Sequence, residues 1–73
     1  MNRYIKSLRA FNDLSQTDVA KKLNISLQSY NRKEKGKVPF TVEEVKILSI
    51  YFKVPIENFF KHEVVNMKTH KLL

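Results

Sequence analysis

Apolar residues recur at helical spacing in the first of two short, neighbouring segments. In that segment, residues 16–23, Val19, Ala20 and Leu23 fall at positions i, i+1 and i+4, which share one face of an α-helix. The second segment, residues 27–35, is mainly polar and basic. The pattern predicts two short helices joined by a tight turn.

Capping residues mark where these two helices begin and end. Ser15 and Ser26 can each accept a hydrogen bond from an unsatisfied N–H group at a helix start. Asn24 tolerates the left-handed backbone that a sharp exit from a helix requires. Gly36, the only glycine, stands at the expected position just after the second helix. The sequence therefore predicts a helix–turn–helix unit over residues 15–36.

Three further helices are expected around this unit. Thr41 followed by Glu44 forms a capping-box pattern that opens the fourth helix, and Pro55 suits the first turn of the fifth. Asn2 is a candidate N-cap for the first helix. The five helices are expected over residues 2–12, 16–23, 27–35, 42–52 and 56–60. Their inward positions are expected to include Ile5, Leu8, Val45, Leu48 and Phe52. The predicted fold class is all-α.

Several residues of the helix–turn–helix unit form a known pattern. They are the Ser15-Gln16 opening, Ala20 where the two helices touch, the Asn24-Ile25-Ser26 turn, Tyr30 in an inward position, and Glu34 and Gly36 at the end. This pattern resembles the motif of the Cro and phage-repressor (XRE-type) family of DNA-binding proteins, and the resemblance extends from about Ile5 to Phe60. It implies a compact five-helix, lambda-repressor-like domain with the motif at helices two and three.

Two residues depart from the family pattern. Asn24 stands in place of the usual glycine of the turn, which is a mild change because asparagine also tolerates a left-handed backbone. Lys33 stands where the family usually has an apolar residue. We expect its aliphatic stem to lie along the helix and its ammonium group to stay in solvent or on a phosphate.

The resemblance also implies roles for three polar side chains. In the family, an arginine at the position of Arg9 pairs with the glutamate near the end of the second motif helix, which here is Glu34. That pair would tie the first helix to the third. The amide of Gln16, together with the N–H groups at the start of its helix, would bind a DNA phosphate.

The net charge of +7 on 73 residues is concentrated on the motif. Residues 21–37 carry six basic side chains and one acidic side chain, a local charge of +5, whereas residues 1–20 and 38–73 contribute +1 each. A surface that faces phosphates requires such a concentration. The alternative is an ordinary solvated basic face, and for Lys21 and Lys22 both interpretations stay open.

The exposed face of residues 27–35 supplies the candidate DNA contacts, since a helix fits the major groove. Gln28 can bond adenine through both ends of its amide, Arg32 can bind guanine through two N–H groups, and Leu27 can contact a thymine methyl. The candidate base contacts are Leu27, Gln28, Ser29 and Arg32, and the candidate phosphate contacts are Gln16, Asn31, Lys35 and Lys37. The expected function is sequence-specific binding of double-stranded operator DNA by a homodimeric transcriptional repressor.

Composition argues against several other classes of protein. There is no cysteine, so neither a disulfide nor a Cys-based zinc site is expected. His62 and His70 show no metal-ligand spacing, and the sequence contains no glycine-rich phosphate loop or nucleophile arrangement. It also contains no signal peptide or membrane-length apolar run. We therefore expect a cytoplasmic protein without enzymatic activity, metal, cofactor, small-molecule substrate or membrane contact.

The tail, residues 61–73, lies beyond the resemblance, so the chain divides into this tail and a DNA-binding domain over residues 1–60. The tail could be a dimer-forming strand, a continued helix or a frayed end. Apolar residues near the C-terminus exceed what a small core needs, and the candidate dimer contacts are Phe59, Phe60, Val64 and Val65. A different function stays open: a protein-binding adaptor, such as an antitoxin or antirepressor, that uses this C-terminal apolar surface.

Overall fold

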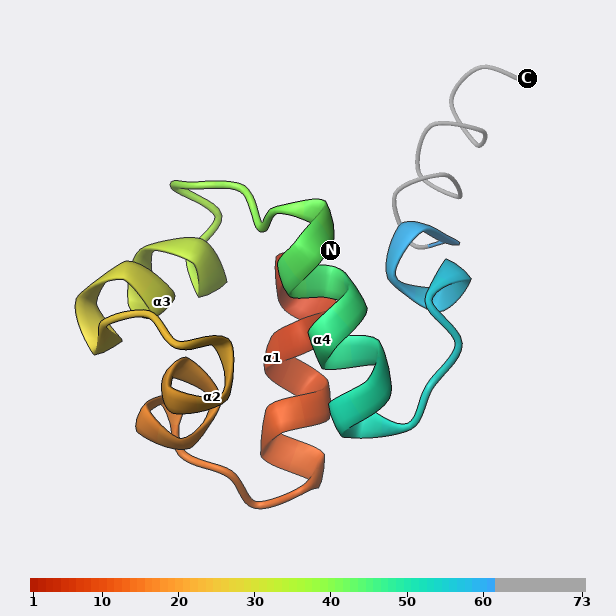
Figure 1. Cartoon of the computed structure of the whole chain (residues 1–73), viewed down its shortest axis with the longest axis horizontal. Helices are drawn as coiled ribbons and strands as arrows, with labels where there is room; N and C mark the ends of the chain where they lie inside the picture. Colours follow the sequence, from red (N-terminus) through yellow and green to blue (C-terminus); the bar gives the residue numbers. More distant parts are fainter. Residues whose placement is uncertain (62–73) are drawn as a thin grey trace.

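Helices account for most of the described chain, which covers residues 1–61 of this computed structural model. Four of them are labelled in Figure 1: α1 (Asn2–Phe11), α2 (Gln16–Leu23), α3 (Leu27–Glu34) and α4 (Val42–Phe52). A fifth, short helical segment covers residues 57–61, and residues 1–61 contain no strand. The all-α prediction is confirmed. Both ends of the four labelled helices and the start of the fifth lie within one residue of their predicted positions.

Figure 1 shows α2 and α3 on one side of the molecule, α1 and α4 in the middle, and residues 57–61 on the opposite side. α2 and α3 make the most extensive contact between any two of the labelled helices. This arrangement leaves the outer side of the α2–α3 pair uncovered by the rest of the described chain. Each helix within residues 1–61 is too short or too polar to span a lipid bilayer.

Side-chain caps define the starts of α2, α3 and α4. The hydroxyls of Ser15, Ser26 and Thr41 accept hydrogen bonds from backbone N–H groups three residues later, at 3.0, 3.0 and 3.1 Å. In α2 and α4 the carboxylates of Asp18 and Glu44 accept a hydrogen bond from the backbone N–H of the cap residue, so each helix begins with a capping box. The caps predicted from the sequence for these three helices are confirmed.

The start of α1 differs from the prediction. Its N-cap is Met1, which makes no side-chain capping bond. Asn2, the expected cap, instead donates its side-chain amide to the carbonyl oxygen of Glu34 at 3.0 Å. The contact therefore joins the beginning of α1 to the end of α3, whereas a capping bond would have turned the amide back onto its own helix.

The core consists of one cluster of buried side chains. Its members are Ile5, Val19, Ala20, Leu23, Tyr30, Val45, Leu48 and Phe59. Leu8 and Phe52, also predicted to point inward, are half-buried and pack against this cluster. Phe59 meets the ring of Tyr4 edge-on, with ring centroids 5.2 Å apart. This aromatic contact holds residues 57–61 against α1.

The burial of Phe59 corrects its predicted role as a dimer contact. Such a contact needs an exposed ring, but the exposed fraction of Phe59 is 0% because the ring fills the core of its own chain. Its neighbour Phe60 is 38% exposed and is available for a contact with a second copy. Val64 and Val65, the other candidate dimer contacts, lie outside the described residues.

Candidate nucleic-acid interface

A three-residue turn of Asn24, Ile25 and Ser26 joins α2 to α3. Asn24 has a left-handed φ of 60° that ends α2. The N–H of Ile25 donates back to the carbonyl oxygen of Ala20 at 3.0 Å, and Ser26 then caps α3. Only three residues separate the two helices, and each of these three residues takes part in a hydrogen bond. The turn therefore fixes the orientation of α3 on α2.

α3 has one buried face and one exposed face. Tyr30, Lys33 and Glu34, at positions i, i+3 and i+4, are buried against the rest of the domain. The opposite face carries Gln28 and Arg32, which are open to solvent, as are Leu27 in the first turn of α3 and Lys35 directly after its end. The exposed fraction of Leu27 is 48%. α3 therefore presents one apolar side chain at its N-terminal end and several hydrogen-bonding side chains on its outer face.

The remaining candidate contacts on and after α3 differ in exposure. Ser29 and Asn31 are half-buried, whereas Lys35 and Lys37 are exposed on either side of Gly36. Gly36 has a positive φ of 83°, which turns the chain out of α3. A Cβ atom at this position would lie 3.2 Å from a side-chain atom of α1, so available space also favours glycine. The turn keeps both lysines close to the end of α3.

Lys22, on α2, contacts α4. Its ammonium nitrogen lies 5.0 Å from the centroid of the Tyr51 ring. Lys21 is exposed. The sequence left open a phosphate contact or a merely solvated side chain for Lys22, and the contact with Tyr51 adds a structural role that neither interpretation included.

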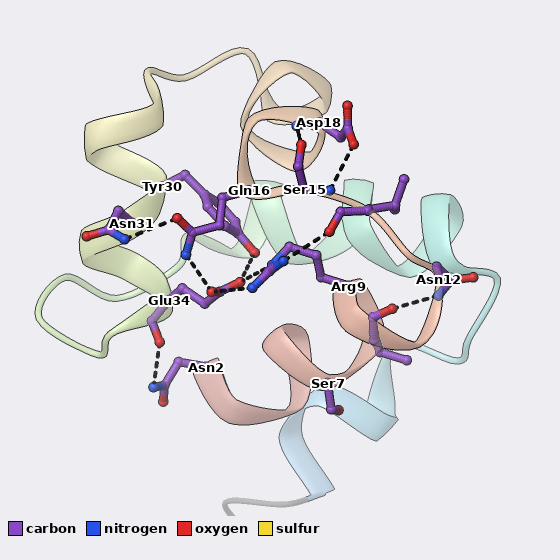
Figure 2. A network of polar contacts seen from close by, with 12 residues as sticks. Asn2, Ser7, Arg9, Asn12, Ser15, Gln16, Asp18, Tyr30, Asn31 and Glu34 are labelled. Atoms are coloured by element: carbon purple, nitrogen blue, oxygen red, sulfur yellow. Dashed lines mark hydrogen bonds and ion pairs between the residues drawn. The ribbon is translucent and has the colours of Figure 1, made fainter.

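A largely buried ion pair joins α1 to the end of α3 (Figure 2). Arg9 Nε donates to Glu34 Oε2 at 2.8 Å, and Arg9 Nη2 donates to Glu34 Oε1 at 3.1 Å, a two-point contact between planar groups. The two side chains are 17% and 3% exposed. Arg9 Nη1 also donates to the carbonyl oxygen of Leu14 at 3.0 Å. The pair that the family resemblance implied is therefore present, and Arg9 also holds the chain that enters α2.

Glu34 accepts two further hydrogen bonds. The Tyr30 hydroxyl donates to Oε2 at 2.6 Å, and Gln16 Nε2 donates to Oε1 at 2.8 Å. Burial works against the charge of Glu34, but hydrogen bonds from Arg9, Tyr30 and Gln16 hold the pKa of this carboxyl below its ordinary value. Burial and the hydrogen bond to Glu34 raise the pKa of Tyr30. Glu34 is therefore a fixed negative charge at the junction of three helices.

The side-chain amide of Gln16, the first residue of α2, also contacts a second residue of α3, Asn31. Its Oε1 accepts a hydrogen bond of 3.2 Å from Asn31 Nδ2. Both side chains are half-buried. Gln16 and Asn31 are both candidate phosphate contacts, and the structure brings them together. Nothing in the spacing of the sequence indicated that they touch.

Lys33 is buried, and the prediction that its ammonium group stays in solvent or on a phosphate is wrong. Its exposed fraction is 9%, and its Nζ donates to Glu44 Oε1 at 2.8 Å and to the carbonyl oxygen of Pro39 at 3.2 Å. The ammonium nitrogen also lies 5.9 Å from the centroid of the Phe40 ring. The position of Lys33, three residues after inward-facing Tyr30, could have indicated its burial. A second ion pair thus attaches α3 to α4.

Residues 1–61 contain no group of three or more His, Cys, Asp or Glu side chains that could hold a metal ion. The two histidines, His62 and His70, lie outside the described residues. The chemistry that this part of the chain offers is therefore hydrogen bonding, positive charge and apolar contact on the surface around α3.

Comparisons with known proteins agree with this geometry. Residues 5–59 match the model of a protein family described as helix-turn-helix. A similar protein from Methanocaldococcus jannaschii, described as the uncharacterized HTH-type transcriptional regulator MJ0272, is 36% identical over 63 residues, which cover 86% of this chain and 96% of that protein. No solved structure matches this chain. Because the family match spans the motif and the core around it, the chain belongs to the XRE-type helix-turn-helix family, which includes Cro-like and phage-repressor-like proteins.

Proposed function

We propose that this chain binds double-stranded DNA with sequence specificity and regulates transcription. The observation that supports this function best is the exposed surface of α3, where Leu27 in the first turn and Gln28 and Arg32 on the outer face are open to solvent while two ion pairs hold the inner face. Family membership and the description of the similar protein as a transcriptional regulator support the same function. A helix with such a face fits the major groove of DNA.

In this proposal the N-terminal part of α3 enters the major groove. Gln28 bonds an adenine, Arg32 bonds a guanine, and Leu27 contacts a thymine methyl group. Ser29, which is half-buried, can reach either a base or a phosphate. The proposed phosphate contacts are Gln16, Lys35 and Lys37, with Asn31 beside Gln16. Phosphate contacts position the protein on the duplex, whereas the base contacts select the sequence.

The positive charge of the motif persists although Lys33 is buried. Glu34, the one acidic residue of residues 21–37, is buried as well and is paired with Arg9. The exposed charged side chains of this segment are therefore all basic, namely Lys21, Lys22, Arg32, Lys35 and Lys37. Counterion release from DNA phosphates would supply much of the affinity of such a surface.

The proposed functional unit is a homodimer that acts as a Cro-like repressor. One domain of this kind buries only about 600–1,000 Å² on DNA, whereas two copies on a two-fold axis can read half-sites about 34 Å apart. Phe60 is a candidate dimer contact, since it is 38% exposed on a segment opposite α3 (Figure 1). Val64 and Val65 remain candidates outside the described residues.

Selection of binding sites from a random duplex pool, followed by footprinting with the full chain, tests this function. We expect a two-fold symmetric footprint and an affinity that falls steeply with salt concentration. A footprint on one asymmetric half-site at saturation would refute the dimer and leave DNA binding intact. An affinity for duplex DNA that is negligible, or insensitive to salt, would refute phosphate-based binding and favour the adaptor function.

A further inference from the structure

Three polar side chains form a hydrogen-bonded series that runs from the buried ion pair towards the surface (Figure 2). Glu34 lies at the inner end, Gln16 lies in the middle, and Asn31 lies at the outer end. Glu34 and Asn31 belong to α3, and Gln16 belongs to α2. Because Gln16 is a proposed phosphate contact, the series connects the core of the domain to its DNA-facing side.

Glu34 determines the direction of each hydrogen bond in this series. An ionised carboxylate only accepts hydrogen bonds, so the end of the Gln16 amide that lies 2.8 Å from Glu34 must be its NH₂ group. The amide oxygen of Gln16 then faces Asn31 and accepts from Nδ2 at 3.2 Å. A free surface glutamine can turn either end of its amide outward, whereas the nitrogen and oxygen of this amide have fixed places.

The other partners of Glu34 make this arrangement specific. Arg9 and Tyr30 supply three of the four hydrogen bonds that the carboxylate accepts, and Gln16 supplies the fourth. The carboxylate is 3% exposed and cannot turn without losing contacts to α1 and α3. The orientation of Gln16 is therefore imposed by a buried group whose own position is fixed from three sides.

We propose that Glu34 and Asn31 are positioning residues for DNA binding, which together hold the Gln16 amide so that its second N–H is presented to a phosphate oxygen. An amide nitrogen carries two N–H groups, and the bond to Glu34 uses one of them. Within residues 1–61 no partner is seen for the second, and Gln16 is half-exposed at the first position of α2.

The opposite orientation would not serve the same purpose. It would turn the amide oxygen of Gln16 towards a phosphate oxygen, and two acceptors cannot form a hydrogen bond. A side chain that is already fixed also avoids the loss of conformational entropy on binding. This inference rests on the proposed DNA binding, and it gives Asn31 an indirect role in place of a phosphate contact of its own.

A double-mutant cycle on DNA affinity tests the role of Asn31. The full chain, Gln16→Ala, Asn31→Ala and the double variant are titrated with a mixed-sequence DNA duplex, because a phosphate contact acts on every sequence. We expect Gln16→Ala to weaken binding about tenfold, the usual order for one hydrogen bond to a charged group. Asn31→Ala should weaken binding several-fold, and the double variant should bind no more weakly than Gln16→Ala.

Salt dependence provides a second measurement in the same experiment. Neither substitution removes a charge, so both should leave the slope of log affinity against log salt unchanged. The matched control is the pair Gln16→Ala and Lys37→Ala, because Lys37 does not contact Gln16; there the two losses should multiply and the slope should fall. Multiplying losses for Gln16 and Asn31 would show that Asn31 contacts DNA itself and would overturn its positioning role.

The possible failures can be told apart. If the unaltered chain does not bind the duplex, the proposed function falls and the inference falls with it. If the unaltered chain binds but Asn31→Ala has no effect, only the inference is overturned. If Gln16→Ala has no effect, the inference and the proposed phosphate contact of Gln16 are overturned, while DNA binding itself stands.

Nuclear magnetic resonance of the Gln16 side-chain amide tests the role of Glu34 in the protein without DNA. We expect widely separated proton shifts for the two N–H groups, because one donates to a carboxylate. They should stay separated in Tyr30→Phe, which leaves Glu34 Oε1 untouched, and approach each other in Glu34→Gln. If Glu34→Gln does not fold, the spectrum of the unaltered chain decides, since shifts typical of a free glutamine there would overturn the inference. Unchanged separation in a folded Glu34→Gln protein would also overturn it.

Discussion

The hydroxyl of Tyr30 donates a 2.6 Å hydrogen bond to the carboxylate of Glu34, one helical turn further along α3. The Tyr30 ring is fully buried and meets the ring of Phe40 edge-on, with centroids 6.0 Å apart. Lys33, which precedes Glu34 in the chain, contributes the positive partner of a second ion pair, with Glu44 of α4. Two consecutive residues of opposite charge therefore attach α3 to two different helices, and this attachment orients its exposed face.

We expect Arg9→Met to lower the free energy of unfolding by about 3–5 kcal/mol, because it would leave the Glu34 charge in a site that is 3% exposed. Glu34→Ala should cost a similar amount, and the double variant should recover part of the loss. Chemical denaturation of the four proteins measures the coupling. Tyr30→Phe, which keeps the ring and removes one hydrogen bond to the carboxylate, should cost only about 1.5–3 kcal/mol. Small, additive losses would contradict a strongly coupled pair.

The stability of the fold should fall at acidic pH because of Glu34. Its pKa in the folded protein lies below the ordinary value of 4.5, so the unfolded chain takes up the proton first as the pH falls. The stability contributed by the charged carboxylate is complete above about pH 4.5 and is lost as the pH falls through the folded pKa. Thermal melting from about pH 6 to about pH 3 measures this loss.

Two variants separate Glu34 from other carboxylates in the pH experiment. Glu34→Gln should be less stable at neutral pH and should show a shallower decline on acidification. Hydrogen bonds from Ser15 also lower the pKa of the exposed Asp18, so Asp18→Asn should remove a separate part of the decline. A pH profile of Glu34→Gln that is parallel to that of the unaltered chain would contradict the assignment.

The two partners of the second ion pair should respond unequally to truncation. Lys33→Leu should cost about 1–3 kcal/mol, because Glu44 loses its cationic partner but keeps its hydrogen bond from the Thr41 N–H at 2.9 Å and lies in the first turn of α4, where a helix stabilises negative charge. Glu44→Ala should cost about 3–5 kcal/mol, because it strands a lysine that is 9% exposed and removes half of a capping box. Equal losses in denaturation experiments would contradict this asymmetry.

Lys53 ends α4 with a left-handed φ of 58°, a conformation that disfavours most side chains. We expect Lys53→Gly to raise the free energy of unfolding by about 0.5–1 kcal/mol. Asn24, at φ 60°, should gain less from the same change, because asparagine tolerates this backbone. Lys46→Gly in the exposed interior of α4 is the matched control and should lower stability by about 1 kcal/mol. Melting curves that show a loss for Lys53→Gly would be the contrary result.

Local features of the sequence were sufficient to predict the elements of this fold. Ser15, Ser26 and Thr41 act on N–H groups only three residues away, so their caps follow from neighbouring residues alone. Tyr30 was placed inward by the family resemblance, and its burial is confirmed. The exposed face of α3 follows directly from that placement.

Contacts between helices were harder to predict, because they depend on how the helices pack. Lys33 and Glu44 are 11 residues apart, Gln16 and Asn31 are 15 apart, and Asn2 and Glu34 are 32 apart. Each of these polar side chains has several possible partners until the tertiary structure is known. The pair between Arg9 and Glu34 was anticipated only because the family resemblance implied it.

The side chains proposed to read bases should behave differently from those proposed to bind phosphates. Arg32→Ala or Gln28→Ala should cost about 1–3 kcal/mol on the selected site and relax the preference at one base position, because a bidentate contact to a base edge is lost. Lys37→Ala should weaken binding to all sequences alike and reduce the salt slope by about one, because it removes one phosphate contact. Titrations on the selected duplex and on a scrambled duplex, at several salt concentrations, distinguish the two outcomes.

Lys46→Ala, on an exposed side chain of α4, is the matched control and should change neither the affinity nor the base preference. If Arg32→Ala left affinity and preference unchanged while Lys46→Ala altered them, α3 would not be the surface that meets DNA.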